Sequence, residues 1–277
     1  MSIVTIIVTY NPASSRFKLV LTSAAAQVSY VLVVDNNSDN KDFIRNICNA
    51  FDNCEFIELG FNFGVAYALK KGIRYAMIKY NPSWLLFLDQ DTVLLNNVLS
   101  KILYIFNVIP ENIRNKIAII LLGNKNKKCE IKEVRYGIFA GTLIKSEVAF
   151  KVCCRDSFFL DQADFDLYSK VRELGYLTVV VDCKLVDHWL GKNYSIPAFS
   201  KILQRKTINY EPPWRFYYIV RNSTKLLIEG RMDLVFYVKQ LIRWSIPIFY
   251  INGPKVFIKM LGLGLSHALL NRLGILC

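Results

Sequence analysis

The stretch "SWLLFLDQDTVL" (residues 83–94) joins an apolar run to two acids that follow it directly. Residues 84–88 are all apolar, Asp89 and Asp91 come next, and the apolar pattern resumes at Val93. A short apolar run bounded by polar residues is typical of a fully buried β-strand. Because residues i and i+2 of an extended chain point the same way, we expect both carboxylates on one side of the strand end.

The acid pair has two interpretations. Aspartate is common in turns because its side chain bonds to the nearby backbone, so the pair could lie in a solvated loop. Alternatively, two hard oxygen ligands on one side suit Mg²⁺ or Mn²⁺, which take one or two carboxylates and leave other positions to water and substrate phosphates. The rest of the sequence has to decide between a loop and a metal site.

Strand-like and helix-like segments alternate along the chain. The strand-like segments are continuous apolar runs, which is typical of a mostly parallel sheet that helices cover on both faces. The sequence therefore predicts an α/β fold. The expected strands are 3–11, 29–39, 54–59, 84–91, 116–124, one or two within 136–150 and one within 177–191; the expected helices are 14–28, 40–50, 62–80 and the later part of 158–176, with a charged hairpin or loop at 125–135.

Polar side chains follow three of the predicted strands. They occupy residues 9–11, 35–38 and 89–91. In parallel sheets, ligands bind outside the carboxyl ends of the strands, where such groups converge. This convergence favours a functional site over a solvated loop for Asp89 and Asp91.

Composition limits the class of protein. With 277 residues, 53% of them hydrophobic, the chain can form one large domain or one domain with an appendage. Residues 1–12 are apolar without a basic leader and end in Asn-Pro, which predicts a first strand rather than a signal peptide. The seven cysteines include no Cys-x-x-Cys pair, which predicts buried thiols in a reducing cytosol.

Positive charge is concentrated in the C-terminal part of the chain. The net charge is +13; residues 191–277 hold 13 Lys and Arg against three acids, a net of +10, so residues 1–190 carry only +3. The longest uncharged runs, 244–254 and 260–271, are shorter than the roughly 18 residues expected of a membrane span. A basic, apolar, interrupted segment is typical of a helix that lies on an anionic membrane. The alternative is a helical subdomain; nucleic-acid binding is not expected, because no nucleic-acid motif is present.

Taken in order, the motifs resemble a known family. They are "VTYNP", "VVDNNSD", "NFGVAYALKKG", "LLFLDQD", "AGTLI", "FFLDQADFDLYSKVRELGY", "DHWLG" and "YYIVRNSTKLL". Together they resemble the family 2 glycosyltransferases, and most closely the bacterial rhamnosyltransferases that build O-antigen and other surface polysaccharides. The resemblance covers about residues 1–225. It implies a GT-A fold, a nucleotide-sugar donor, a divalent metal and inversion at the anomeric carbon.

The resemblance assigns a donor site. It implies that Asp35 hydrogen-bonds the base, whose ring N–H needs an acceptor. Gly64 and Gly141 are positions where a ligand could approach the backbone closely, because glycine has no side chain. The implied donor-binding residues are Thr9, Tyr10, Asn11, Asp35, Asn62, Gly64, Asp89 and Gly141.

The resemblance also implies which residues bind the metal. Asp91 is expected as a direct ligand, and Asp89 as a contact to the ribose or to a metal-bound water. His188, in "HWLG", matches a family motif that approaches the metal or the diphosphate. A single histidine can also be purely structural, so this alternative stays open for His188.

A second acidic group lies in "LDQADFDL" (residues 160–167). Carboxylates at the start of a helix cap free N–H groups, which accounts for some of these acids. An inverting transfer also needs a base for the acceptor hydroxyl. The resemblance places Asp164 in this role, Asp161 as the second candidate or an acceptor contact, and Asp166 as structural support. Arg221 is expected to pair with the diphosphate or a lipid phosphate, or to lie on a helix surface.

The sequence thus predicts a metal-dependent inverting glycosyltransferase. The expected reaction transfers L-rhamnose from dTDP-L-rhamnose to a lipid-linked oligosaccharide at the cytoplasmic face of the bacterial membrane. Residues 1–215 would form a catalytic GT-A domain, and residues 216–277 a basic amphipathic helical region that associates with the membrane. One alternative is another donor, such as UDP-galactofuranose, UDP-glucose, UDP-galactose or an amino sugar. The other is a non-catalytic subunit that binds nucleotide sugars, which the presence of Asp89, Asp91, Asp164 and His188 together argues against.

Overall fold

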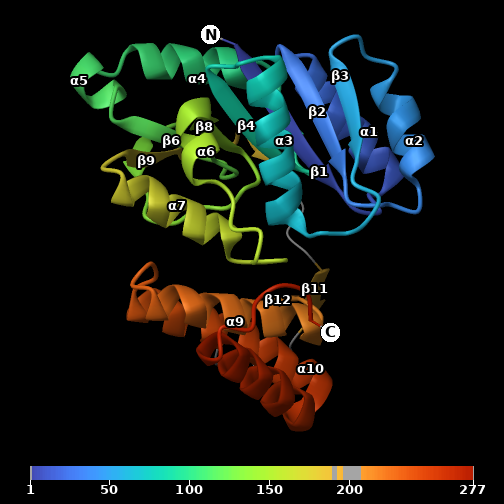
Figure 1. Cartoon of the computed structure of the whole chain (residues 1–277). Helices are drawn as coiled ribbons and strands as arrows, with labels where there is room; N and C mark the ends of the chain where they lie inside the picture. The colour runs from blue at the N-terminus through green and yellow to red at the C-terminus, as the bar shows by residue number, and fades with distance from the viewer. Residues whose placement is uncertain (1, 189–191, 196–206, 277) are drawn as a thin grey trace. The chain divides into compact units, whose positions relative to one another are not determined.

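The computed structural model describes residues 2–188, 192–195 and 207–276 (Figure 1). The chain divides into two compact units. The first unit contains residues 1–156 and 164–188, and the second contains residues 157–163 and 189–277. The predicted boundary at residue 215 separates a catalytic region from a membrane-associating one, and it stays a prediction.

The helices and strands alternate as expected over the first part of the chain. The strands are β1 (Ile3–Thr9), β2 (Tyr30–Asp35), β3 (Cys54–Glu58), β4 (Trp84–Asp89), β5 (Val93–Leu94), β6 (Ile117–Leu122), β7 (Ile131–Glu133), β8 (Thr142–Lys145), β9 (Leu177–Val181), β10 (Val186–Asp187), β11 (Lys192–Ser195) and β12 (Thr207–Tyr210). The helices are α1 (Ser14–Ala25), α2 (Lys41–Cys48), α3 (Val65–Lys79), α4 (Val98–Asn107), α5 (Glu111–Arg114), α6 (Ser146–Val152), α7 (Ala163–Glu173), α9 (Pro213–Ile228) and α10 (Leu234–Leu269).

An eight-stranded sheet forms the centre of the first unit, in the order β3-β2-β1-β4-β8-β6-β9-β7. Strands β3, β2, β1 and β4 run parallel to one another, and β6 is parallel to β9. Strand β8 is antiparallel to both β4 and β6, and β7 is antiparallel to β9. The predicted mostly parallel sheet is confirmed, and the antiparallel strands come from the middle of the chain, where the sequence pattern is least regular.

Strand β1 marks the point where the sheet changes direction. The chain adds β2 and β3 on one side of β1 and then crosses to place β4 on the other side. In open α/β sheets, such a reversal leaves a crevice outside the carboxyl ends of the two central strands. The segments after β1 and β4 both reach this position, and they carry the polar groups at residues 9–11 and 89–91.

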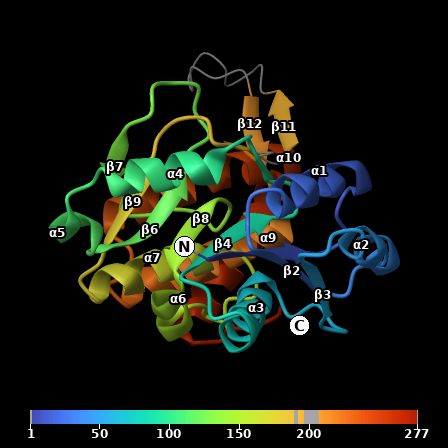
Figure 2. The same cartoon turned by 90° about the horizontal axis from the view of Figure 1, so that it is seen from above.

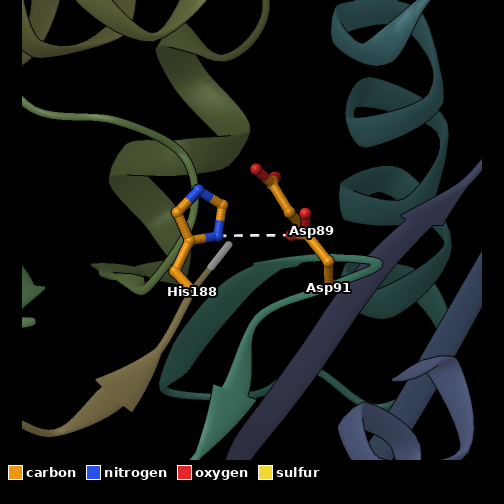
Figure 3. A group of neighbouring side chains, drawn as sticks. All are labelled: Asp89, Asp91 and His188. Atoms are coloured by element: carbon orange, nitrogen blue, oxygen red, sulfur yellow. Dashed lines mark ion pairs between the residues drawn. The ribbon is translucent and has the colours of Figure 1, made fainter. Parts of the chain in front are cut away.

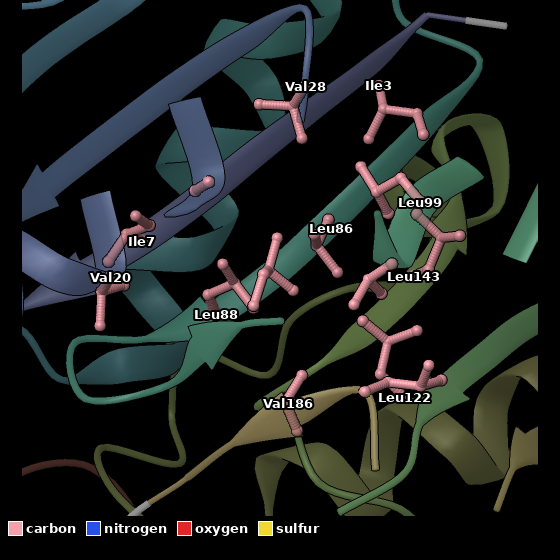
Figure 4. Close-up of a cluster of buried hydrophobic side chains, with 14 of the residues drawn as sticks. Ile3, Ile7, Val20, Val28, Leu86, Leu88, Leu99, Leu122, Leu143 and Val186 are labelled. Carbon is pink, nitrogen blue, oxygen red and sulfur yellow. The ribbon is translucent and has the colours of Figure 1, made fainter. Parts of the chain in front are cut away.

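Alternate residues of the central strands pack on opposite faces of the sheet. Ile3 and Ile7 of β1 belong to the core beneath α1 and α4, together with Val20 and Leu99 (Figure 4). Ile6 points to the other face, where α3 crosses so closely that a Cβ added to Gly72 would lie 2.8 Å from Ile6 Cγ2. Figure 2 shows the sheet between α1 and α4 on one side and α3 and α6 on the other.

A two-stranded pair outside the main sheet joins distant parts of the first unit. Strand β5, directly after the "DQD" segment, pairs antiparallel with β10, directly before His188. Val93 lies opposite Asp187, and Leu94 opposite Val186. Because ladder hydrogen bonds fix the register of the two strands, this pair brings His188 close to the acids after β4.

The second unit contains α9, α10 and the antiparallel pair β11–β12. Phe216 and Val220 of α9 pack with Ile248 of α10 in a small core. Helix α10 leaves helical geometry at Gly253, with φ 83° and ψ 167°. Because its uncharged runs are short, the sequence was not expected to contain a membrane-spanning helix. Helix α10 is nevertheless long and apolar enough, by length and composition alone, to cross a membrane.

The predicted free thiols are wrong for the part of the chain that the structure describes. Disulfides join Cys48 to Cys54 and Cys129 to Cys183. The pairs at 48–54 and 129–183 link segments that strand pairing and turns bring together, and the residue spacing of the sequence does not show this proximity. Cys277 lies outside the described residues.

Candidate metal and donor site

One group of metal-ligating side chains lies at the β1–β4 reversal. Asp89 ends β4, Asp91 follows two residues later, and His188 follows β10. The donor atoms of these three side chains all lie within 4.8 Å of one another, and no other group of this kind occurs among the described residues. Figure 3 shows the imidazole facing the two carboxylates. The structure thus brings together the three residues that the sequence analysis assigned to a metal.

The surroundings of the Asp91 carboxylate suit a bound cation. Its Oδ1 atom is buried and accepts no hydrogen bond from the described part of the chain. The atom lies 3.2 Å from His188 Nδ1, with which it forms an ion pair when the ring is protonated. A buried carboxylate oxygen without a hydrogen bond is costly, and coordination to a divalent ion would compensate it.

The electrostatics of His188 depend on the same carboxylates. Burial of the ring favours the neutral form and lowers its pKa, but the contact with Asp91 and the charge of Asp89 outweigh burial, so the pKa of His188 is raised above 6.5. Thr92 Oγ1 lies 2.7 Å from Nδ1 of the same ring and holds its orientation. In the folded protein the protonated ring is therefore stabilising at low pH, and this contribution is lost as the pH rises through the folded-state pKa.

Side chains between and beside the acids hold the segment after β4 in place. Gln90 Oε1 accepts the Tyr10 N–H at 2.8 Å, and its Nε2 donates to the Tyr10 carbonyl at 3.2 Å. The Thr92 N–H donates to the Asp89 carbonyl at 3.1 Å and closes a turn. The sequence analysis did not assign roles to Gln90 and Thr92, although their place in "DQDT" between and beside the acids was a usable signal.

Asp35 is the centre of the loop after β2 and is not an open acceptor. Its carboxylate is 0% exposed and accepts hydrogen bonds from Thr9 Oγ1 at 2.7 Å, Ser38 N at 2.8 Å and Ser38 Oγ at 2.5 Å. Asp35 therefore holds this loop in place, and its predicted contact with a base stays a prediction. Thr9 is also fully buried and supports the loop in the same way.

The outer edge of this loop is more accessible. Asn11 Nδ2 donates to Asp39 Oδ2 at 3.1 Å, and the Asp39 N–H donates to Asn11 Oδ1 at 2.7 Å. Asp39 is exposed, and Tyr10 is 49% exposed. Asp39 is thus an accessible carboxylate that the sequence analysis missed, although it lies in the quoted motif "VVDNNSD".

Gly64 and Gly141, where a ligand was predicted to approach the backbone, have different surroundings in the structure. Gly64 begins α3 with φ 87° and ψ 166°, a region that glycine alone adopts readily, and its N–H donates to Asn62 Oδ1 at 3.0 Å. Gly141 is buried, donates to the Phe87 carbonyl at 2.9 Å and accepts from Leu122 N at 2.8 Å. Gly141 therefore joins sheet strands, and the predicted ligand contacts of Gly141, Asn62 and Gly64 stay predictions.

The three acids of residues 160–167 have different surroundings. Asp161 belongs to the second unit, where Arg215 donates to both of its carboxylate oxygens at 3.0–3.2 Å. Asp166 is buried and pairs with Lys170 at 2.7 Å, in line with the structural role expected of it. Asp164 is partly exposed in the first turn of α7, and its Oδ1 accepts the Phe165 N–H at 2.9 Å. Arg215 thus binds Asp161, whose predicted role as second candidate base or acceptor contact stays a prediction.

Arg221 lies inside the second unit. Its side chain is 1% exposed and lies over the rings of Tyr217 and Tyr218. It donates to the Gly274 carbonyl at 2.8 Å and so holds the C-terminal segment against α9. This burial rules out the alternative that Arg221 lies on a helix surface, and its phosphate contact stays a prediction.

The affinity for Mn²⁺ is expected to rise with pH, because the His188 ring cannot hold a proton and a cation at the same nitrogen. Since the pKa of His188 is raised above 6.5, the affinity should still be rising above that pH. Electron paramagnetic resonance of free Mn²⁺ measures the affinity at each pH. His188→Gln should flatten the profile and His267→Gln, at the other histidine of the chain, should preserve it; an unchanged profile in His188→Gln would remove the ring from the site.

Comparison with known proteins agrees with this geometry. Residues 4–113 match the model of Glycosyl transferase family 2. The chain is 29% identical to the dTDP-rhamnosyl transferase RfbF of Shigella flexneri, over 87% of this chain and 85% of the relative.

Solved structures share the fold. The TarS fragment 1–349 of S. aureus in complex with UDP-GlcNAc has a TM-score of 0.59 at 16% identity, over 97% of this chain and 81% of that one. The mannosyltransferase PcManGT of Pyrobaculum calidifontis, in complex with GDP-Man and Mn²⁺, has a TM-score of 0.57 at 15% identity, over 99% and 76%. The family match spans β1–β4, so residues 4–113 form a family 2 glycosyltransferase domain, and the solved structures share the fold of the chain.

Proposed function

We propose that this glycosyltransferase transfers L-rhamnose from dTDP-L-rhamnose to a lipid-linked saccharide, with inversion at the anomeric carbon. The observation that carries the proposal is the group of Asp89, Asp91 and His188 beside the β1–β4 reversal, where a nucleotide diphosphate would bind. The choice of donor rests on the likeness to a dTDP-rhamnosyl transferase over most of the chain.

Asp91, Asp89 and His188 would hold a divalent cation, either Mg²⁺ or Mn²⁺. The buried Oδ1 atom of Asp91 and the short distances between the donor atoms support this assignment. When bound, such an ion supplies positive charge that offsets the negative charge developing on a leaving nucleoside diphosphate. The protein's own contribution is to keep the carboxylates and the imidazole on one side of the strand end.

The nucleotide would bind along the loops after β1 and β2. Tyr10 offers an exposed ring and Asp39 an exposed carboxylate at the outer edge of these loops. Asp35 and Thr9 hold the loop from below through their buried hydrogen bond. At Gly64, the absence of a side chain leaves the start of α3 open to a diphosphate, and helix N-termini favour anions.

Asp164 would act as the base. In an inverting transfer, the acceptor oxygen attacks the anomeric carbon, the bond to the diphosphate oxygen breaks, and the hydroxyl proton passes to a carboxylate. Asp164 belongs to the same unit as the metal group and is partly exposed. Asp166 is less suited because its side chain is only 1% exposed, and Asp161 because it belongs to the second unit.

The second unit would bring the enzyme to the cytoplasmic face of the cell membrane, where a lipid-linked acceptor lies. Its helix α10 combines apolar residues that stay exposed with basic ones, which suits an anionic interface. The exposed apolar residues are Leu234, Val235, Val238, Ile242, Phe249, Tyr250, Ile258 and Leu269, and the exposed basic residues are Lys239, Arg243, Lys255 and Lys259.

Donor turnover is the first test of the proposal. Purified protein is incubated with a panel of nucleotide sugars, with Mn²⁺ or Mg²⁺ and with EDTA, and released nucleoside diphosphate is measured. We expect release from dTDP-L-rhamnose and loss of release in EDTA. Release from a UDP-sugar alone would refute the rhamnose donor but keep the mechanism. If no donor is hydrolysed without an acceptor, the affinity of the protein for each nucleotide sugar is measured to identify the donor. A protein that binds a nucleotide sugar but transfers no sugar to membrane lipid extracts would favour the non-catalytic subunit.

Replacement of Asp164 by Asn should lower kcat by about 10²–10⁴-fold, because the amide cannot take the acceptor proton. Binding of the donor nucleotide should stay near the wild-type value, since Asp164 makes no contact with the donor in this proposal. Asp156→Asn is the matched control, because Asp156 pairs with Lys70 on the surface of the same unit. Normal turnover in Asp164→Asn would assign the base elsewhere.

Binding to vesicles tests the membrane association. Vesicles that contain anionic lipid should bind the protein, and the double variant Lys255→Glu/Lys259→Glu should bind at least about tenfold more weakly, at roughly 1 kcal/mol for each basic residue near the surface. Lys18→Glu/Lys71→Glu, at exposed positions of the first unit, is the control. Equal binding to neutral vesicles would contradict the electrostatic model, and resistance of the cellular protein to alkaline carbonate extraction would instead indicate that α10 spans the membrane.

A further inference from the structure

Arg16 lies near the start of α1, far in sequence from both segments of the metal group, yet it bonds to both. Its Nε donates to the Asp91 carbonyl at 2.8 Å. Its Nη2 donates to the Asp187 carbonyl at 2.5 Å, and its Nη1 to Asp187 Oδ2 at 2.9 Å. The side chain is only 7% exposed, so these bonds are largely shielded from water.

The bonds of Arg16 reach the backbone beside two of the proposed ligands. Asp91 is itself a ligand of the metal group, and Asp187 directly precedes His188. The β5–β10 ladder adjoins both bonds, because Val93 lies opposite Asp187. A single guanidinium thus holds together the two chain segments that carry Asp91 and His188.

The geometry of arginine matters for this arrangement. The guanidinium is a planar fork that donates in several directions at once, and here it reaches two carbonyls and one carboxylate. A hydrogen bond to a carbonyl restricts the rotation of its peptide group. The bonds to the carbonyls of Asp91 and Asp187 therefore restrict the directions in which the side chains of Asp91 and His188 can point.

We infer that Arg16 is a positioning residue, which sets Asp91 and His188 in a ligating arrangement before a divalent cation binds. The inference rests on the metal site of the proposed function and adds a residue that lies outside the sequence motifs. Groups that support metal ligands from behind change metal affinity by about 10–100-fold when they are replaced. A buried arginine that served only the fold would not change metal affinity selectively.

The test compares Arg16→Lys and Arg16→Met with the wild-type full chain. Lysine keeps the charge but is a compact donor on a flexible chain, so it cannot reproduce the fork that joins both carbonyls. Arg45→Lys is the matched control, since Arg45 pairs with Asp42 and Glu58 on the surface of the same unit. Each protein is titrated with Mn²⁺ in the presence of dTDP and, separately, of UDP, and free Mn²⁺ is measured by electron paramagnetic resonance.

We expect Arg16→Lys and Arg16→Met to bind Mn²⁺ about 10–100-fold more weakly than the wild type, and Arg45→Lys to bind it equally well. The Mn²⁺ concentration for half-maximal turnover should rise in Arg16→Lys, while kcat at saturating Mn²⁺ returns near the wild-type value. This split separates positioning from general damage, which would lower kcat at every Mn²⁺ concentration. Thermal unfolding in EDTA shows whether each variant is folded. If Arg16→Met does not fold, the result for Arg16→Lys decides the test.

Two results would overturn the inference in distinguishable ways. If the wild type binds Mn²⁺ and Arg16→Lys binds it equally well, Arg16 has no positioning role, and the proposed function stands. If the wild type binds no Mn²⁺ with either nucleotide, the metal site itself fails, and the role of Arg16 fails with it.

Discussion

Two carboxylates that repel each other at the end of one strand are the constraint around which the first unit is arranged. Asp89 and Asp91 lie together beside the reversal between β1 and β4, and Oδ1 of Asp91 is buried without a hydrogen bond from the described chain. Such an arrangement is unfavourable unless positive charge is close. Arg16 and His188 supply some of that charge, and a divalent cation would supply the rest.

The loops around the acids are held by side chains that do not themselves face the crevice. Asp35 accepts three hydrogen bonds from Thr9 and Ser38 inside the first unit, and Gln90 binds the backbone of Tyr10 across from β4. These contacts keep the carboxyl ends of adjacent strands in register, so the exposed groups at the edge need little rearrangement to meet a ligand. Binding sites whose parts are already placed lose less conformational entropy when the ligand arrives.

Environment separates acids that look alike in sequence. Asp161, Asp164 and Asp166 occur within six residues, yet an arginine in the second unit binds the first and a lysine one helical turn away binds the last. Asp164 is left partly exposed at the start of α7. The same distinction applies to Arg221, whose position in a motif suggested a phosphate contact but whose packing between tyrosine rings gives it a structural role.

The sequence by itself determined the alternation of strands and helices, the buried strand before Asp89 and the proximity of the acids to the sheet edge, because apolar periodicity and residue spacing are local properties of the chain. The pairing of His188 with Asp91 was expected only from a family motif. Tertiary structure alone decided that Arg16 reaches across to Asp91 and Asp187, that Asp35 is covered by its neighbours and that β8 runs antiparallel. It also decided that Cys48 pairs with Cys54 and Cys129 with Cys183. Each of these depends on contacts between residues distant in sequence or on the burial they produce, and no local pattern carries that information.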